Sequence, residues 1–174
     1  CDGGIYCAKD CKCYGSFKPT SPPSKGCACD PIKFEDEKLK NAICSALNYD
    51  DGCDVCAEEA RELLELSAGG LGIRSLVGLE HFINLRYLFL RNNLIVDIRP
   101  LRGLTSLTDL RLGENQIRDV SPLSGLTNLI DLYVPHNQIS EIGHLMDLKD
   151  LERLYLSENH IENIERLSGL MNLE

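Results

Sequence analysis

Nine cysteines are the side chains of this chain best suited to chemistry, and all of them lie within its first 56 residues. Thiols at this density pair as disulfides in oxidising compartments, or their thiolates hold zinc. No histidine lies in residues 1–60, and the cysteine spacing fits no common zinc ribbon. We therefore predict disulfides and keep a metal site as the alternative. The disulfide candidates are Cys7, Cys11, Cys13, Cys27, Cys29, Cys44, Cys53 and Cys56.

The remaining cysteine, Cys1, makes the cysteine count odd, which points to a separate role for it. As a mature N-terminus it is similar to the lipid-modified cysteine that begins a bacterial lipoprotein. The other eight cysteines can then pair completely, so Cys1 is a lipidation candidate. The chain has no apolar run of about eighteen residues, so we expect it to reach a membrane only through that lipid or through a region beyond residue 174.

Catalysis requires a nucleophile or a base held beside an orienting group. The repeats described below place no serine or cysteine beside a histidine–carboxylate pair, and no phosphate loop or metalloprotease motif is present. Cys53-x-x-Cys56 has the spacing of a redox pair but lacks the βαβ context of such pairs. We predict no catalytic residue, no cofactor and no enzymatic activity. The four histidines are His81, His136, His144 and His160.

A repeat of 22 residues organises the rest of the chain. The pattern L-x-x-L-x-L-x-x-N-x-I, with one valine for leucine, is typical of a leucine-rich repeat solenoid. We predict an α/β solenoid, a horseshoe with a parallel concave sheet whose strands lie near Leu88–Leu90 and its equivalents. Apolar residues at every third position after the strand indicate 3₁₀ segments on the convex side. The copies begin at Leu85, Leu107, Leu129 and Leu151, and the pattern starts again at Leu173.

Each repeat carries one asparagine where the chain leaves the strand and turns. A buried amide at this position can bond backbone groups of its own and of the neighbouring turn. We therefore interpret these asparagines as a structural ladder rather than as a functional site. The preceding copy of the repeat is degenerate, and Leu71 replaces its asparagine. The ladder consists of Asn93, Asn115, Asn137 and Asn159.

Composition and pattern divide the chain into three regions. Residues 1–33 are a Cys-rich N-terminal segment that includes a Pro/Ser linker, and residues 34–62 are a helical N-terminal cap. Residues 63–174 hold one degenerate and four consensus repeats and stop at the start of the next, so we expect a longer protein. Within the cap we predict an amphipathic helix over 37–47 with Asp36 as its N-cap, and a second helix over 57–64.

The same pattern predicts a binding surface, because the x positions of each strand point outward on the concave side. Four of the ten aromatic residues fall there, with arginines between them. Tyrosine and arginine are enriched at binding hot spots, although aromatics also suit strands for structural reasons alone. We expect a protein ligand on this face, since a net charge of −9 without a basic cluster argues against nucleic acid. The predicted binding residues are Tyr87, Phe89, Arg91, Arg111, Tyr133, His136, Arg153 and Tyr155.

The repeats resemble those of bacterial internalin-type surface proteins. The resemblance rests on Asp97-Ile98-x-Pro100-Leu101, on Asp119-Val120-Ser121-Pro122-Leu123 and on Phe34-x-Asp36 in the cap, and it covers about residues 34–174. It implies a secreted or surface-anchored module, outside the cytoplasm, that binds other proteins through its concave sheet. The cysteines are a departure, because internalin caps generally lack them.

A second resemblance implies that the protein lies in a different cellular compartment. The later repeats, with Leu154-Tyr155-Leu156-Ser157-x-Asn159-x-Ile161, also look like those of a regulatory subunit of protein phosphatase 1. That likeness implies an intracellular scaffold, and the dense N-terminal cysteines argue against it. A further alternative is that the chain is the binding region of a larger enzyme.

Overall fold

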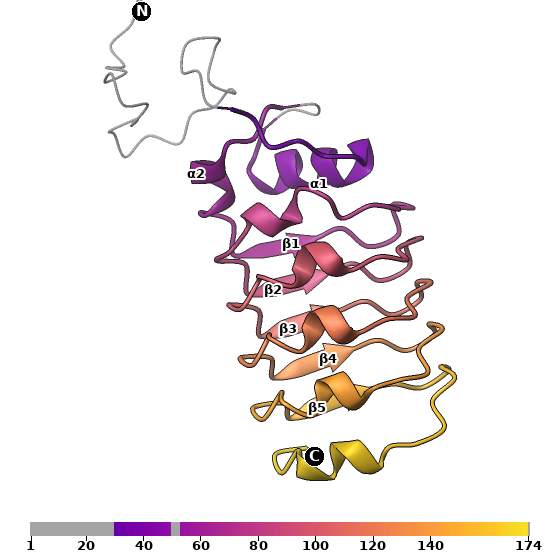
Figure 1. The fold of residues 1–174 in the computed structure, drawn as a ribbon. Coiled ribbons are helices and arrows are strands. Elements are labelled where there is room, and N and C mark those ends of the chain that lie inside the picture. Colours follow the sequence, from indigo (N-terminus) through magenta and orange to yellow (C-terminus); the bar gives the residue numbers. More distant parts are fainter. Residues whose placement is uncertain (1–29, 50–52, 174) are drawn as a thin grey trace, which may run out of the picture.

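Five short parallel strands stack along one axis to form the sheet of a solenoid (Figure 1). The structure is a computed structural model, and it describes residues 30–49 and 53–173. Neighbouring strands pair at a constant offset of one repeat, so that Leu66 lies beside Leu88 and Leu88 beside Leu110. This confirms the predicted fold class. The strands are β1 (Glu65–Ser67), β2 (Tyr87–Phe89), β3 (Asp109–Arg111), β4 (Asp131–Tyr133) and β5 (Arg153–Tyr155).

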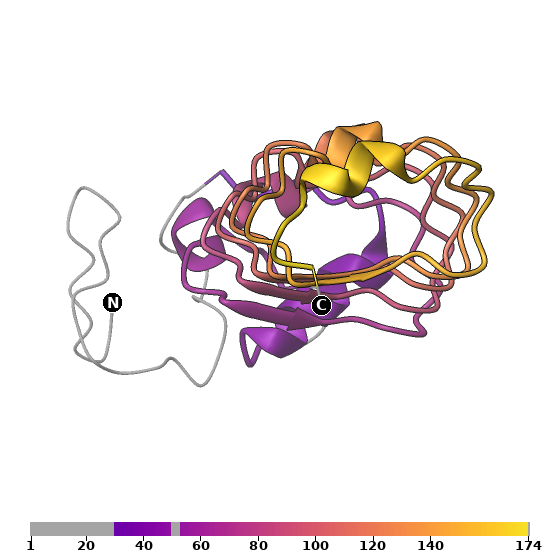
Figure 2. The same ribbon diagram turned by 90° about the horizontal axis from the view of Figure 1, so that it is seen from below.

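Each coil returns to the next strand through a 3₁₀ helix on the side opposite the sheet. Figure 2, viewed along the stack, shows the coils superimposed, with the strands along one side and the 3₁₀ helices along the other. A 3₁₀ helix is short because its hydrogen-bond geometry is poor, which suits a compact return. These helices are η1 (Leu79–His81), η2 (Arg99–Leu101), η3 (Ser121–Leu123), η4 (Gly143–Leu145) and η5 (Glu165–Gly169).

Aliphatic side chains fill the inside of the coils. Leu88, Leu110 and Leu132 are fully buried at equivalent positions of successive strands. Burying one such side chain contributes roughly 1.5–3 kcal/mol before the entropy cost is subtracted. One coil alone cannot enclose these side chains, so the stability of the solenoid comes from stacking.

The repeated asparagines hydrogen-bond the backbones of two successive coils. Asn115 Oδ1 accepts from Ile95 N–H (3.0 Å), and its Nδ2 donates to the carbonyls of Leu90 (3.0 Å) and Leu112 (2.9 Å). Asn93, Asn137 and Asn159 bond equivalent groups. Each amide therefore serves its own coil and the coil before it.

This arrangement explains why the first repeat needs no asparagine. Asn93 of the following repeat already accepts from the backbone N–H groups of Leu71 (3.2 Å) and Ile73 (2.9 Å). An asparagine at position 71 would serve an earlier coil, but the cap stands there instead. Leu71 is accordingly exposed, between Gly70 and Gly72, which both have positive φ.

The cap begins with α1 (Glu37–Ala46), which nearly matches the helix predicted over 37–47. Asp36 is its N-cap, and its carboxylate also accepts from Arg74 N–H (2.7 Å) in the first repeat. Phe34 packs beside Phe82, with ring centroids 6.4 Å apart. Gly78 allows this contact, because a Cβ there would lie 2.5 Å from the Phe34 ring.

A disulfide joins Cys44 of α1 to Cys53, with Cα atoms 5.8 Å apart, which confirms the predicted cystine chemistry for this pair. Cys56 is disulfide-bonded as well. The lipidation candidate and five of the disulfide candidates lie outside the described residues; they are Cys1, Cys7, Cys11, Cys13, Cys27 and Cys29.

Two predicted boundaries were wrong. The strand expected near Leu88–Leu90 begins and ends one residue earlier. The helix expected over 57–64 is α2 (Ala57–Ala60), four residues shorter. Asn84 Nδ2 donates to the Arg61 carbonyl (2.8 Å). This side chain takes the place of the backbone N–H that would bond the carbonyl in a longer helix, so the chain can extend toward β1.

Candidate functional site

The outward-pointing side chains of β1–β5, here called the sheet face, form straight columns because the strands pair in a constant register. The last residue of each strand belongs to the sheet face, and its type differs on most strands. Ser67 of β1 is followed by Phe89, Arg111, Tyr133 and Tyr155. We call the last four residues the central column.

The central column is a continuous stack. The Arg111 guanidinium carbon lies 4.8 Å from the ring centroid of Phe89 and 4.8 Å from that of Tyr133. The Tyr133 and Tyr155 rings are stacked, with centroids 4.3 Å apart and planes inclined by 10°. Cation–π and aromatic pairs at such distances attract. Four side chains from four different repeats therefore hold one another in fixed positions.

Asp109 fixes the cation at the centre of this stack. Arg111 Nε donates to Asp109 Oδ1 (3.1 Å) and Nη2 donates to Oδ2 (2.9 Å). This bidentate hydrogen bond raises the pKa of Arg111 above its ordinary value. Loss of hydration and the neighbouring Tyr155 raise the pKa of the Tyr133 phenol. The column therefore carries one positive charge, on Arg111.

A second column runs beside the first, and Tyr87, Asp109, Asp131 and Arg153 compose it. Arg153 Nη2 donates to Asp131 Oδ2 (2.7 Å), its Nε donates to Oδ1, and this hydrogen bonding raises the pKa of Arg153. Tyr87 is 42% exposed at the β2 end of the column. The two columns together place aromatic rings and charged pairs on one rigid surface.

Two predicted binding residues lie off both columns. Arg91, just after β2, donates from Nε to Glu114 Oε1 (3.0 Å). His136 lies on the turn after β4, in the left-handed region with φ 53°. Glu114 and Glu158 adopt the same conformation in their own repeats, so the geometry of the coil, and not the histidine itself, determines this conformation. The structure thus brings four of the eight predicted residues into one stack and leaves His136 at its margin.

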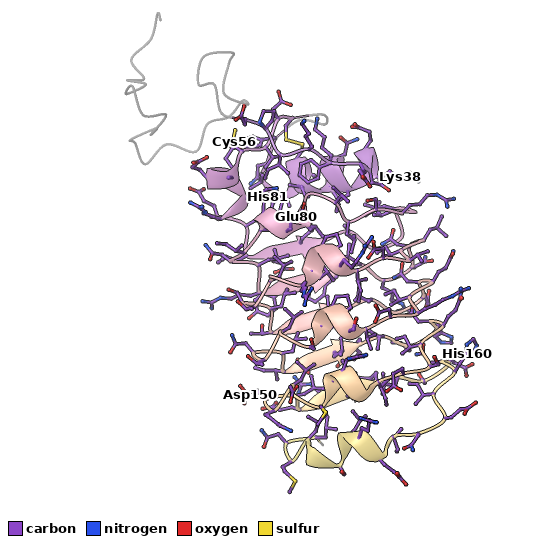
Figure 3. All side chains as sticks on the ribbon, viewed as in Figure 1. Lys38, Cys56, Glu80, His81, Asp150 and His160 are labelled. Carbon is purple, nitrogen blue, oxygen red and sulfur yellow. A yellow bond between two sulfur atoms is a disulfide. The ribbon has the colours of Figure 1, made fainter. Side chains whose placement is uncertain are left out.

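Sequence reasoning missed the acidic partners of the arginines and a groove beside the sheet. The groove, about 600 Å³ in volume, runs along the edge where the strands begin. Figure 3 shows Asp150 at this edge and His160 at the opposite one. Asn128 and Asn172, both lining the groove, donate to the carbonyls of Thr105 (2.8 Å) and Lys149 (2.9 Å). Their recurrence 44 residues apart, with Asn84 before them, was visible in the sequence.

The histidines are scattered over the solenoid. His81 belongs to η1 and His144 to η4, whereas His136 and His160 follow strands. Within residues 30–49 and 53–173, no three His, Cys, Asp or Glu side chains gather in a way that would hold a metal ion. In that same part of the chain, no helix has the length and apolar character to cross a membrane.

Comparison with known proteins agrees with this geometry. A family model described as Leucine Rich repeats (2 copies) matches residues 83–125 and 127–170, which together make up half of the chain. No curated protein sequence gives a significant match.

Two solved structures from Listeria monocytogenes match most of the chain. The internalin InlF from Listeria monocytogenes superposes with a TM-score of 0.78 at 35% identity, and the match covers 82% of this chain and 44% of InlF. The functional domain of InlJ from Listeria monocytogenes, which includes a cysteine ladder, gives 0.76 at 20% identity, with 83% and 33% covered.

A plant receptor shares the fold at lower similarity. The ectodomain of the receptor kinase GASSHO1/SCHENGEN3 from Arabidopsis thaliana gives a TM-score of 0.52 at 23% identity, with 60% of this chain and 13% of the receptor covered. The chain thus spans less than half the length of these solved relatives. By its repeats and its likeness to InlF, the chain belongs to the leucine-rich repeat family and is of the bacterial internalin type.

Proposed function

We propose that this chain is a non-catalytic protein-binding module of a secreted or surface-anchored bacterial protein, and that the partner binds on the sheet face. The observation that carries the proposal is the central column. Its four side chains come from four repeats and lie in contact, and the coil of β1 closes with a serine, Ser67, at the equivalent position.

The chemistry of the column suits a protein ligand. Tyrosine and arginine dominate binding hot spots, because they offer large contact areas with few flexible bonds. Side chains already held in place lose less entropy on binding, so more of the contact energy appears as affinity. The negative net charge of −9 disfavours nucleic acid, which needs a positive stripe.

Related proteins and the cap support the location outside the cytoplasm. InlF is an internalin, and the GASSHO1/SCHENGEN3 ectodomain was solved in complex with CASPARIAN STRIP INTEGRITY FACTOR 2. Disulfides such as Cys44–Cys53 persist in oxidising compartments. Lipidation of Cys1 would provide an anchor, and it remains part of the proposal.

The test uses a peptide binder selected against the immobilised chain from a displayed random library. The variant Tyr133→Ala/Tyr155→Ala removes the two stacked rings, and we expect at least about thirtyfold weaker binding, the loss of a hot spot worth 2 kcal/mol. The control, Val96→Ala, removes an exposed side chain between β2 and η2 and should bind normally. Unchanged affinity of the double variant, with its melting temperature retained, would place the binding site elsewhere.

A further inference from the structure

The sheet face ends at β1 in a shelf formed by Glu65, Ser67 and Gly69. We infer that this shelf receives an arginine side chain of the protein partner, which stacks on the free face of Phe89 and pairs with Glu65. The inference rests on the proposed function and adds to it the chemistry of the partner.

The shelf is low because two of its three residues, Ser67 and Gly69, are small. Ser67 and Gly69 are exposed on β1 and just after it, whereas β2 beside them carries Tyr87 and Phe89. Gly69 cannot carry a larger side chain without a shift, since a Cβ there would lie 3.1 Å from the Arg91 carbonyl oxygen. The result is a step, with β1 as its floor and the aromatic side chains of β2 as its wall.

Phe89 has one occupied face and one facing the shelf. The Arg111 guanidinium covers the face toward β3, at 4.8 Å from the ring centroid. Since the stack runs across the strands, the other face is turned toward Ser67, its register partner on β1. Ser67 is exposed, so the space above it is open. A planar cation placed there would repeat the contact that Arg111 makes.

The charge on the shelf matches that cation. Glu65 is exposed and has no ion-pair partner among the residues that the structure describes. The equivalent acidic residues on β3 and β4, Asp109 and Asp131, are each paired with an arginine. Of these three carboxylates, Glu65 is therefore the one without an ion-pair partner among the described residues.

A comparison of β1 with β3 shows what is missing. In β3, Asp109 binds Arg111 two residues later, and Arg111 stacks on Phe89. In β1, Glu65 occupies the place of Asp109, and Ser67 the place of Arg111. An arginine from the partner would supply the absent guanidinium. Arginine fits better than lysine because its planar fork both stacks on a ring and bonds a carboxylate through two N–H groups.

The test is an NMR titration of the isotope-labelled chain with N-acetyl-arginine N-methylamide at constant ionic strength. The matched ligand is the citrulline derivative, which has nearly the same shape without the charge. We expect the Ser67 amide and the Phe89 ring signals to shift with arginine and not with citrulline. Equal shifts from both ligands, or shifts confined to other residues, would overturn the inference.

Three variants and a control make the test specific. Glu65→Gln and Phe89→Leu should each weaken the response about two- to fivefold, the effect of losing one exposed ion pair or cation–π contact. Ser67→Arg should abolish the response, because its own guanidinium would fill the shelf. Glu62→Gln, which removes an exposed carboxylate from the cap, should leave the response unchanged.

The rest of each amide spectrum reports whether a variant is folded. A negative arginine titration would disprove the arginine site on the shelf. It would not affect the proposal that a peptide binds at Tyr133 and Tyr155. If the Tyr133→Ala/Tyr155→Ala variant binds the peptide normally while the arginine titration is positive, the central column is not the binding site, but the arginine site on the shelf stands.

Discussion

The inside and the outside of the coils follow different rules. Inside, Leu88, Leu110 and Leu132 repeat one residue type at one register position, because every coil must fill the same space. One residue further along each strand, on the outside, the chain places phenylalanine, arginine, tyrosine and tyrosine in turn. The contrast teaches that the fold constrains the interior, whereas it leaves the residue types of the sheet face free to vary.

The largest effect should come from an interior asparagine. Asn115→Leu leaves the Ile95 N–H without a partner and removes one of the two amide donors from each of the Leu90 and Leu112 carbonyls, which still accept from Asn93 and Asn137. With about 1–3 kcal/mol for the buried unsatisfied N–H and about 0.5–1.5 kcal/mol for each of the two lost hydrogen bonds, we expect a loss of about 4 kcal/mol in unfolding free energy, measured in urea. The matched change Asn128→Leu removes one exposed hydrogen bond to Thr105 and should cost less than about 1 kcal/mol. Equal losses would contradict the distinction between inside and outside.

The cap disulfide should rank second. Cys44 and Cys53 are nine residues apart, and closing a loop of this length stabilises a protein by about 2–3 kcal/mol in the chain-entropy model. We expect Cys44→Ala/Cys53→Ala to lower the unfolding free energy by that amount. Calorimetry at matched concentration measures the change. An unaltered melting temperature would show that the repeats do not depend on this bond.

Asp36 joins the cap to the first repeat, and its removal should cost about 2 kcal/mol, the sum of a helix cap and further backbone hydrogen bonds. Partial burial raises the pKa of this carboxyl, but four backbone N–H bonds, from Arg74, Leu39, Lys38 and Ser75, lower it below its ordinary value of 3.8. A depressed pKa stabilises the folded state above the unfolded pKa and ceases to do so as the pH falls through the folded value.

The stability difference between the native chain and Asp36→Ala should therefore be constant from pH 5 to 7 and shrink below about pH 4, the unfolded pKa. Urea unfolding at several pH values measures it. A difference that grows on acidification would contradict the assigned role of the carboxylate.

The smallest change in stability should come from the sheet face. Tyr155→Ser removes an exposed ring from the end of the central column, and we expect a loss of no more than about 1 kcal/mol. The same urea measurement applies. A loss as large as that of Asn115→Leu would mean that the central column is structural, and it would remove the reason to regard it as a binding surface.

The interior was predictable from the sequence because it is periodic. Leu88 and Asn115 recur at fixed spacing, so the strand face, the turn and the 3₁₀ return follow from the pattern. The boundary of α2 was not predictable, since it depends on Asn84, a side chain 23 residues away from the carbonyl that it bonds. Local propensity cannot report such a contact.

The site was predictable only as a list of outward positions. That Arg111 stacks between Phe89 and Tyr133 and binds Asp109 depends on side-chain conformations across the sheet. The left-handed turn at Glu114 also went unpredicted, because glutamate does not favour it and the shape of the coil imposes it. Sequence patterns specify which side chains face outward, whereas their pairing follows from the register.

The most direct test of the central claim is to map the surface of the molecule that a binder contacts. Side-chain NMR signals of the labelled chain should be followed while the library-selected peptide is added. The account predicts that the perturbed signals belong to Phe89, Arg111, Tyr133 and Tyr155, and that those of η2 and η3 on the opposite side do not move. Perturbations concentrated on the 3₁₀ side, with the central column unaffected, would contradict it.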